Sequence, residues 1–207
     1  MEPVFFAKEF ENKNFSNHIV FICDHASNYI PRKYRKLGIS NSELESHIAF
    51  DIGAKNLTIN LAKKLKQSYF LSNFSRLLID PNRNEIDREL ISVSSFGVEI
   101  PKNLNISVQE REHRINFFYN YYHKNLGNFV KTKINKYKNV FLVSIHSFTK
   151  NSKNFNRGIE VGLLWNKSMD LLLPIQRYLK DKKIHFGRNY PYSGFHYNYT
   201  IDRLCMN

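Results

Sequence analysis

Residues 18–25, His-Ile-Val-Phe-Ile-Cys-Asp-His, place a short run of β-branched and aromatic side chains directly before an acid and an imidazole. An apolar run of this length and composition is typical of a buried strand. Pro31 prevents a helix from beginning cleanly in the polar residues that follow. In an open α/β sheet, ligands bind just beyond the carboxyl ends of the strands. His25 is therefore a candidate for chemistry, although a polar loop that only caps the sheet would look the same.

A second segment repeats this plan. Residues 139–145, Asn-Val-Phe-Leu-Val-Ser-Ile, form the clearest strand pattern of the chain and end at His146. Further strands are expected at 68–72, 76–80, 159–165 and 185–187, and helices at 40–65, 108–138 and 168–180. Residues 1–17 are expected to form a lead-in loop or edge strand, and residues 82–107 a long loop. The alternation predicts an α/β fold with a largely parallel, mixed sheet flanked by helices.

Composition narrows the class of protein. The chain has 207 residues, of which 42% are hydrophobic, as expected for one domain over residues 1–207. The net charge of +13 is spread through amphipathic segments, so nucleic acid is an unlikely partner, whereas small acidic substrates would be attracted. No apolar run approaches the roughly 20 residues that span a bilayer, and residues 1–10 lack the basic start and long apolar core typical of a signal peptide. With two cysteines only, we expect a cytoplasmic protein without a membrane partner.

Two histidines at the ends of two parallel strands face a common edge of the sheet. Zinc in catalytic sites commonly takes three protein ligands of the His, Asp or Glu type and leaves one position open for water. His25 and His146 supply two ligands. His47 and Asp51 lie four residues apart in the predicted helix, where they share a face. They either hydrogen-bond each other or supply the third ligand to the metal.

Arginines form a second cluster. Arg76, Asn82 and Arg83 flank the short apolar piece at 76–80, and Arg157 comes just before the strand that carries Glu160. The planar guanidinium group matches a carboxylate with two parallel hydrogen bonds. A metal pocket lined by arginines fits an amide or ester substrate that carries free carboxylates.

The sequence resembles the N-formylglutamate amidohydrolase family. The resemblance rests on motifs that occur in the same order and together cover residues 18–203: CDHASNYIP at 23–31, HIAFDIGA at 47–54, SRLLIDPNR at 75–83, Glu110-Arg111, Tyr122-His123, IHSFT at 145–149, GIEVGLLW at 158–165 and NYPYSG at 189–194. Each motif is weak alone, but their joint order is specific. The family is similar to zinc-dependent exopeptidases of phosphorylase/hydrolase-like α/β architecture, which hydrolyse an amide carbon–nitrogen bond.

The resemblance implies roles for individual residues. His25, Asp51 and His146 become the expected zinc ligands, with His47 as the alternative third ligand or a catalytic residue. Glu160 is the expected general base. The remaining predicted site residues bind the substrate: Arg76, Asn82, Arg83 and Arg157 hold its carboxylates, and Asn189 and Tyr192 line the pocket. The expected substrate is a small acidic N-acyl amino acid such as N-formylglutamate.

Two alternatives remain open. The same metal site suits a peptidase or cell-wall amidase, and the basic composition suits a non-catalytic binding module on the same fold. Family members continue past the segment that corresponds to Thr200–Arg203 with a histidine and a further helix, whereas only Leu204–Asn207 follow here. We therefore expect apolar surface near this end, which a homodimer would cover.

Overall fold

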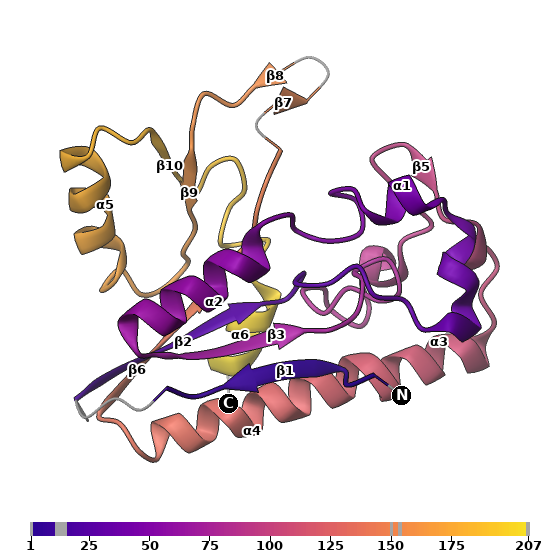
Figure 1. Ribbon diagram of the computed structural model, residues 1–207, viewed down its shortest axis with the longest axis horizontal. Coiled ribbons are helices and arrows are strands. Elements are labelled where there is room, and N and C mark those ends of the chain that lie inside the picture. Colours follow the sequence, from indigo (N-terminus) through magenta and orange to yellow (C-terminus); the bar gives the residue numbers. More distant parts are fainter. Residues whose placement is uncertain (1, 11–15, 150, 153–154, 206–207) are drawn as a thin grey trace.

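The computed structural model describes residues 2–10, 16–149, 151–152 and 155–205. A four-stranded sheet of order β1-β3-β2-β6 forms its centre (Figure 1). Strands β2 (Asn17–Cys23), β3 (Ser68–Ser72) and β6 (Asn139–Ser144) are parallel, and β1 (Phe5–Lys8) adds an antiparallel edge. The predicted mixed, largely parallel sheet is therefore confirmed. Because Ile22 pairs with Ser144, the chain leaves β2 and β6 at the same edge of the sheet.

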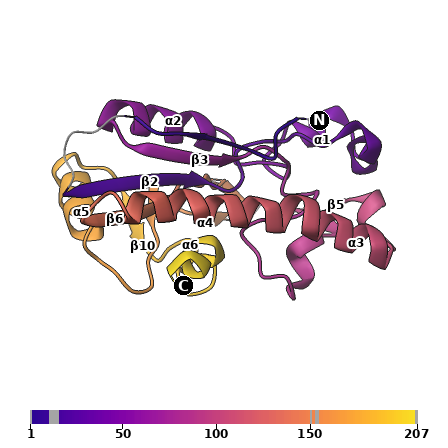
Figure 2. The same ribbon diagram turned by 90° about the horizontal axis from the view of Figure 1, so that it is seen from below.

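Helices cover both faces of the sheet. Figure 2 shows α2 (Ala54–Leu65) on one side of the strands and α4 (Tyr121–Ile134) on the other. Alternate residues of β2 serve the two sides: Ile22 belongs to the large core with α4, and Cys23 packs in a smaller cluster with Ala54 of α2. Helix α4 continues α3 (Val108–Arg114) through a π-helical segment, Ile115–Asn120, so the helix predicted at 108–138 is one interrupted helix.

The single helix predicted at 40–65 is broken in the structure: helices form at its two ends, and turns separate them. Only α1 (Asn41–Leu44) forms after Ser40, whose hydroxyl accepts from the Glu43 N–H in a capping box, and the helix ends after one turn. Turns follow until α2, which Gly53 precedes with φ of +83°, a left-handed conformation suited to glycine. Within these turns the Asp51 N–H donates to the His25 carbonyl at 2.9 Å, which ties this segment to the end of β2.

The segments at 76–80 and 82–107 also differ from expectation. Residues 76–78 form a turn rather than a strand, with buried Leu77 and Leu78. The predicted long loop contains short elements: η2 (Arg88–Ile91), β4 (Ser94–Ser95), β5 (Val98–Glu99) and η3 (Pro101–Asn103). A 3-10 segment, η1 (Arg32–Gly38), lies against η3.

The last quarter of the chain forms smaller units beside the main sheet (Figure 1). They are the hairpin of β7 (Asn151–Ser152) and β8 (Phe155–Asn156), the parallel pair β9 (Val161–Leu163) and β10 (Phe186–Arg188), α5 (Leu172–Asp181) and α6 (Tyr199–Cys205). The strand predicted at 159–165 is thus shorter than expected. Over the described ranges, every helix is too short or too polar to cross a membrane.

Candidate metal centre

Three predicted ligands meet at the carboxyl edge of the sheet. The imidazoles of His25 and His146 and the carboxylate of Asp51 offer ligand atoms that all lie within 4.8 Å of one another. His25 follows β2 and His146 follows β6, whereas Asp51 comes from the turns before α2. Among the residues that the structure describes, this is the one group of at least three His, Cys, Asp or Glu side chains with such spacing.

Asp51 lies between the two imidazoles. Its Oδ2 is 2.8 Å from His146 Nδ1 and 3.5 Å from His25 Nδ1, and it accepts the Ser147 N–H at 3.2 Å. The His25 and Asp51 side chains are buried, whereas the His146 side chain is 31% exposed. Two nitrogens and one oxygen with an open side form a donor set that suits catalytic zinc.

A second carboxylate orients His25. Asp80 Oδ1 is 2.8 Å from His25 Nε2, and the same oxygen accepts the Asn82 N–H at 2.8 Å. Since a buried carboxylate accepts the proton of Nε2, the lone pair of His25 is placed on Nδ1, the atom that faces Asp51. The sequence reasoning missed this role of Asp80. Its position directly before Pro81, at the end of an apolar piece, was the available signal.

Asp24 acts similarly on His146 through a hydroxyl. Ser144 Oγ lies 3.0 Å from His146 Nε2 and 3.4 Å from Asp24 Oδ2, while Asp24 itself is 3.7 Å from the imidazole. The other Asp24 oxygen accepts from the Tyr122 hydroxyl at 2.8 Å. Each imidazole of the cluster thus has an acidic partner on the side away from Asp51, as is usual for metal-binding histidines.

The electrostatics of the cluster favour a cation. Burial opposes ionisation, yet His25 and His146 hold the pKa of Asp51 far below its usual range, and His25 and Arg76 do the same for Asp80. Although burial disfavours an imidazolium, Asp24 and Asp51 raise the pKa of His146 to about 10. The two carboxylates therefore favour the second proton on His146 in the metal-free cluster, and binding of a divalent cation would replace that proton.

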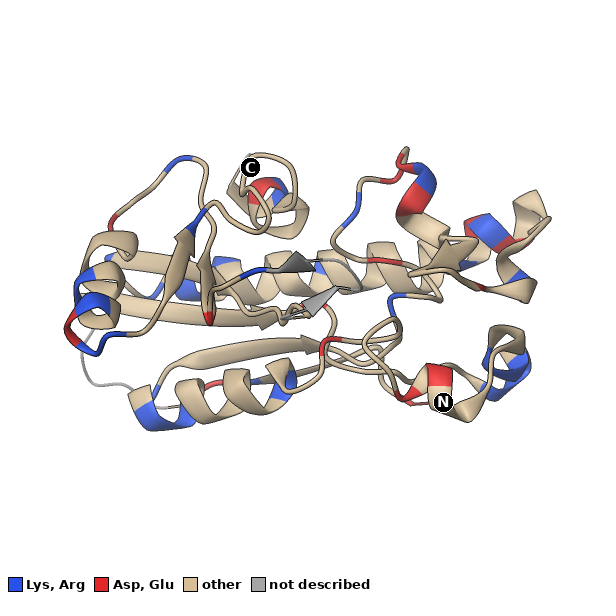
Figure 3. Cartoon of the chain, turned by 90° about the horizontal axis from the view of Figure 1, so that it is seen from above, with Lys and Arg blue, Asp and Glu red and all other residues tan. Residues whose placement is uncertain are grey.

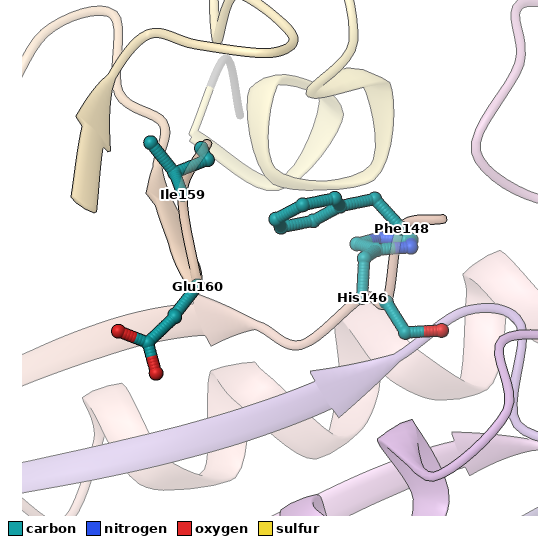
Figure 4. A pocket seen from close by; sticks show the side chains of 5 residues that line it. His146, Phe148, Ile159 and Glu160 are labelled. Carbon is teal, nitrogen blue, oxygen red and sulfur yellow. The ribbon is translucent and has the colours of Figure 1, made fainter. Parts of the chain in front are cut away.

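A pocket of about 230 Å³ opens beside His146, lined also by Ser147, Phe148, Ile159 and Glu160. Glu160, the predicted general base, lines this pocket, but Figure 4 shows its carboxylate directed away from His146. That carboxylate accepts the His185 N–H at 3.2 Å.

Arg157 and Tyr192 come together near this pocket. Arg157 Nη2 donates to the Tyr192 hydroxyl at 3.1 Å, and the guanidinium lies 5.0 Å from the Tyr192 ring centre and 5.4 Å from that of Phe148. Its Nη1 is buried and has no hydrogen-bond partner within the described part of the chain. A planar cation held between two rings with one unused donor fits an anionic ligand group.

The other predicted substrate residues have internal partners. Arg76 contacts Asp80 at 3.0 Å and Asp51 at 3.9 Å, beside the cluster. Asn82 accepts the Thr200 N–H at 3.1 Å at the start of α6. The guanidinium of Arg83 stacks on the ring of Tyr197.

Asn189 and His47 also serve the fold. Asn189 Oδ1 accepts two backbone N–H groups, at 3.0 and 2.9 Å, and so shapes the loop that it was expected to present to substrate. His47 does not share a helical face with Asp51, because the predicted helix is broken there; its ring packs against Phe96 with centres 4.7 Å apart.

A mixed sheet with two histidines at the ends of parallel strands, joined by an aspartate from the turns before α2, defines a candidate metal-dependent hydrolase. The family model described as FGase, N-formylglutamate amidohydrolase, matches residues 17–206, and the chain belongs to this family. It is therefore an amidohydrolase, an enzyme that hydrolyses amide bonds. No match was found among the curated proteins.

Two solved structures share the fold. A gene product of Agrobacterium tumefaciens is 28% identical, with a TM-score of 0.89 over 98% of this chain and 79% of its own. N-formylglutamate amidohydrolase from Ralstonia eutropha is 20% identical, with a TM-score of 0.68 over 91% of this chain and 76% of its own. At that lower identity the likeness shows the fold alone.

Proposed function

We propose that the chain is a zinc-dependent hydrolase that cleaves the amide carbon–nitrogen bond of a small N-acylated amino acid such as N-formylglutamate. The observation that carries this proposal is the convergence of His25, Asp51 and His146 within 4.8 Å, in a chain of this family. When bound, zinc supplies a water whose pKa is lowered to about 7 and polarises the acyl carbonyl.

The chain's own residues prepare this chemistry. Asp80 holds the Nε2 proton of His25, and Asp24 with Ser144 holds the Nε2 side of His146, so both Nδ1 atoms are available to the metal. Glu160 is the proposed general base that takes a proton from the attacking water and passes it to the leaving nitrogen. It lines the pocket beside His146, and this role requires its side chain to rotate from the His185 N–H toward the histidine.

Substrate recognition would use the arginines on either side of the cluster. Arg157 Nη1 has no hydrogen-bond partner among the described residues, and the side chain would turn this buried donor toward one carboxylate. Arg76, with a side chain 26% exposed beside Asp51, offers a second cation at the metal. Arg83 and Tyr192 would add a guanidinium and a hydroxyl near the 189–197 loop. Roles for Asn82 and Asn189 in binding substrate, and for His47 in catalysis, stay predictions.

The proposal is tested by formate release from zinc-loaded and chelator-treated protein. N-formylglutamate should be hydrolysed faster than N-formylalanine, which lacks the second carboxylate, and far faster than short unformylated peptides. The His25→Ala variant, in which the metal loses a ligand, should be inactive. Full activity of that variant, or equal activity after complete metal removal, would refute the proposal.

The alternatives receive less support. A pocket of about 230 Å³ suits a compact substrate better than a peptide or cell-wall strand. Figure 3 shows lysines and arginines distributed over several elements rather than gathered along one strip, which argues against a polyanion-binding module. The cytoplasmic location and the homodimer stay predictions.

A further inference from the structure

Two fully buried polar side chains outside the cluster contact the 77–78 backbone, between Arg76 and Asp80. Arg114, at the end of α3, is 2% exposed, and Asn103 of η3 is 1% exposed. Arg114 Nη1 donates to Asn103 Oδ1 at 2.7 Å and to the Leu78 carbonyl at 3.1 Å, while its Nε bonds Glu110 at 2.9 Å. A buried guanidinium is costly unless its donors are used, and here they bond one backbone carbonyl and the side chains of Asn103 and Glu110.

Asn103 also holds the backbone next to Leu78. Its Nδ2 donates to the Leu77 carbonyl at 2.8 Å and to the Ser92 carbonyl at 2.7 Å. The side chains of Leu77 and Leu78 are buried, so water does not replace these bonds readily. Two consecutive carbonyls, both in the turn at 76–80, are therefore held by one arginine–asparagine pair.

This turn presents two side chains to the metal centre. Arg76 precedes the held carbonyls and contacts Asp51 and His25, the latter at 3.4 Å from Nδ1. Asp80 follows them and bonds His25 Nε2. A shift of the turn would move both partners of His25 at once.

We propose that Arg114 and Asn103 are positioning residues of the metal centre: they fix the 76–80 turn, and through Asp80 they set the orientation and tautomer of His25. The pair touches neither metal nor substrate. The inference rests on the proposed function where zinc binding and activity are measured, whereas the His25–Asp80 hydrogen bond is tested in metal-free protein without substrate.

Three variants separate positioning from stability. Arg114→Met removes the donors and keeps an apolar stem. Asn103→Asp keeps the oxygen that faces Arg114 but loses both N–H donors, so a carboxylate oxygen faces the Leu77 and Ser92 carbonyls. Lys133→Met is the matched control, since Lys133 is also a buried cation paired with one glutamate, Glu9, but lies near the amino end of β2.

The first readout is the downfield proton NMR signal of the His25 Nε2–H in metal-free protein, assigned by its loss in His25→Gln. We expect it to shift or broaden in Arg114→Met and Asn103→Asp and to stay in place in Lys133→Met. The second readout is the zinc Kd from chelator competition, which should rise about tenfold or more in Arg114→Met and Asn103→Asp and stay unchanged in Lys133→Met. With zinc saturating, kcat for formate release should fall in those variants while KM changes little.

The outcomes are distinguishable. If Arg114→Met or Asn103→Asp folds with an unchanged NMR signal and a zinc Kd within about threefold of the wild type, the positioning role is refuted. Equal changes in Lys133→Met would refute it as well, because they would reflect stability alone. Failure of wild-type protein to release formate would overturn the proposed substrate, yet the NMR comparison would still decide the role of Arg114 and Asn103.

Discussion

Replacing Asp80 with asparagine tests the hydrogen bond that orients His25 in the candidate metal centre. The Asp80 carboxylate is 4% exposed and receives three partners: His25 Nε2 at 2.8 Å, Arg76 Nη2 at 3.0 Å and the Asn82 N–H at 2.8 Å. Asparagine preserves the shape and one acceptor oxygen, but it removes the charge and points an NH2 group at a donor. One of the two side-chain partners, His25 or Arg76, thus loses its acceptor.

The magnitude follows from the burial of the partners. Breaking a buried ion pair costs about 3–5 kcal/mol, and since the Arg76 side chain remains 26% exposed and keeps Asp51 nearby, we expect about 2–3 kcal/mol of lost stability. Loss of an outer partner of a metal-binding histidine weakens metal affinity about 10- to 100-fold. This corresponds to about 1.4–2.7 kcal/mol of binding free energy.

The assay pairs urea unfolding of the metal-free protein with zinc competition against a chromophoric chelator. Asp181→Asn, the same substitution at an exposed position at the end of α5, is the control and should leave both values unchanged. If Asp80→Asn binds zinc as tightly as the control, His25 does not depend on Asp80 and the described geometry is wrong.

Three further predictions follow from buried or unpaired groups. Tyr122→Phe removes the hydroxyl bond to buried Asp24 and should lower the free energy of unfolding by about 1.5–3 kcal/mol in urea denaturation. Burial chiefly lowers the pKa of His123 from 6.5 to about 4, so the unfolded chain binds this proton at a higher pH than the folded chain does. The free energy of unfolding should therefore fall by about 3 kcal/mol as pH drops from about 6.5 to 4. The His123→Gln variant should lose this pH dependence in thermal melts. Arg157→Ala should raise KM for N-formylglutamate about 10- to 100-fold through loss of a carboxylate contact, whereas Arg188→Ala, which removes an arginine stacked on Trp165, should not.

The strands could be predicted because burial shapes their sequences directly. Segments 68–72 and 139–145 are short, apolar and bounded by polar residues, and the structure places β3 at 68–72 and β6 at 139–144. Since parallel strands share their carboxyl edge, the meeting of His25 and His146 also follows from the pattern. The ring centres of these histidines lie 4.9 Å apart.

The helix at 40–65 shows where periodicity misleads. Apolar residues recur at helical spacing through this stretch, but the turn at Gly53 and the bond from Asp51 to the His25 carbonyl break it. Asp51 reaches the cluster because of this break, not from a shared helical face with His47. The sequence thus predicts Asp51 for this cluster from a helical face that the structure does not contain.

Asp80 and Arg114 lay beyond sequence reasoning for a different reason. Asp80 bonds a histidine 55 positions away, and Arg114 bonds a carbonyl 36 positions away. Side-chain bonds over such separations leave no periodic trace, so the sequence offers only the position before Pro81 as a signal for Asp80, and none for Arg114. The π-helical segment before α4, which helps to bring Tyr119 to the Arg83 carbonyl and Tyr122 to Asp24, is likewise set by packing.

The metal content of protein purified without chelators tests the central claim most directly. The described cluster predicts about one zinc per chain by elemental analysis, reduced to background in a folded His146→Ala variant. Zinc below about a tenth of an equivalent in the wild type, or an unchanged content in the variant, would contradict a metal centre built on His25, Asp51 and His146.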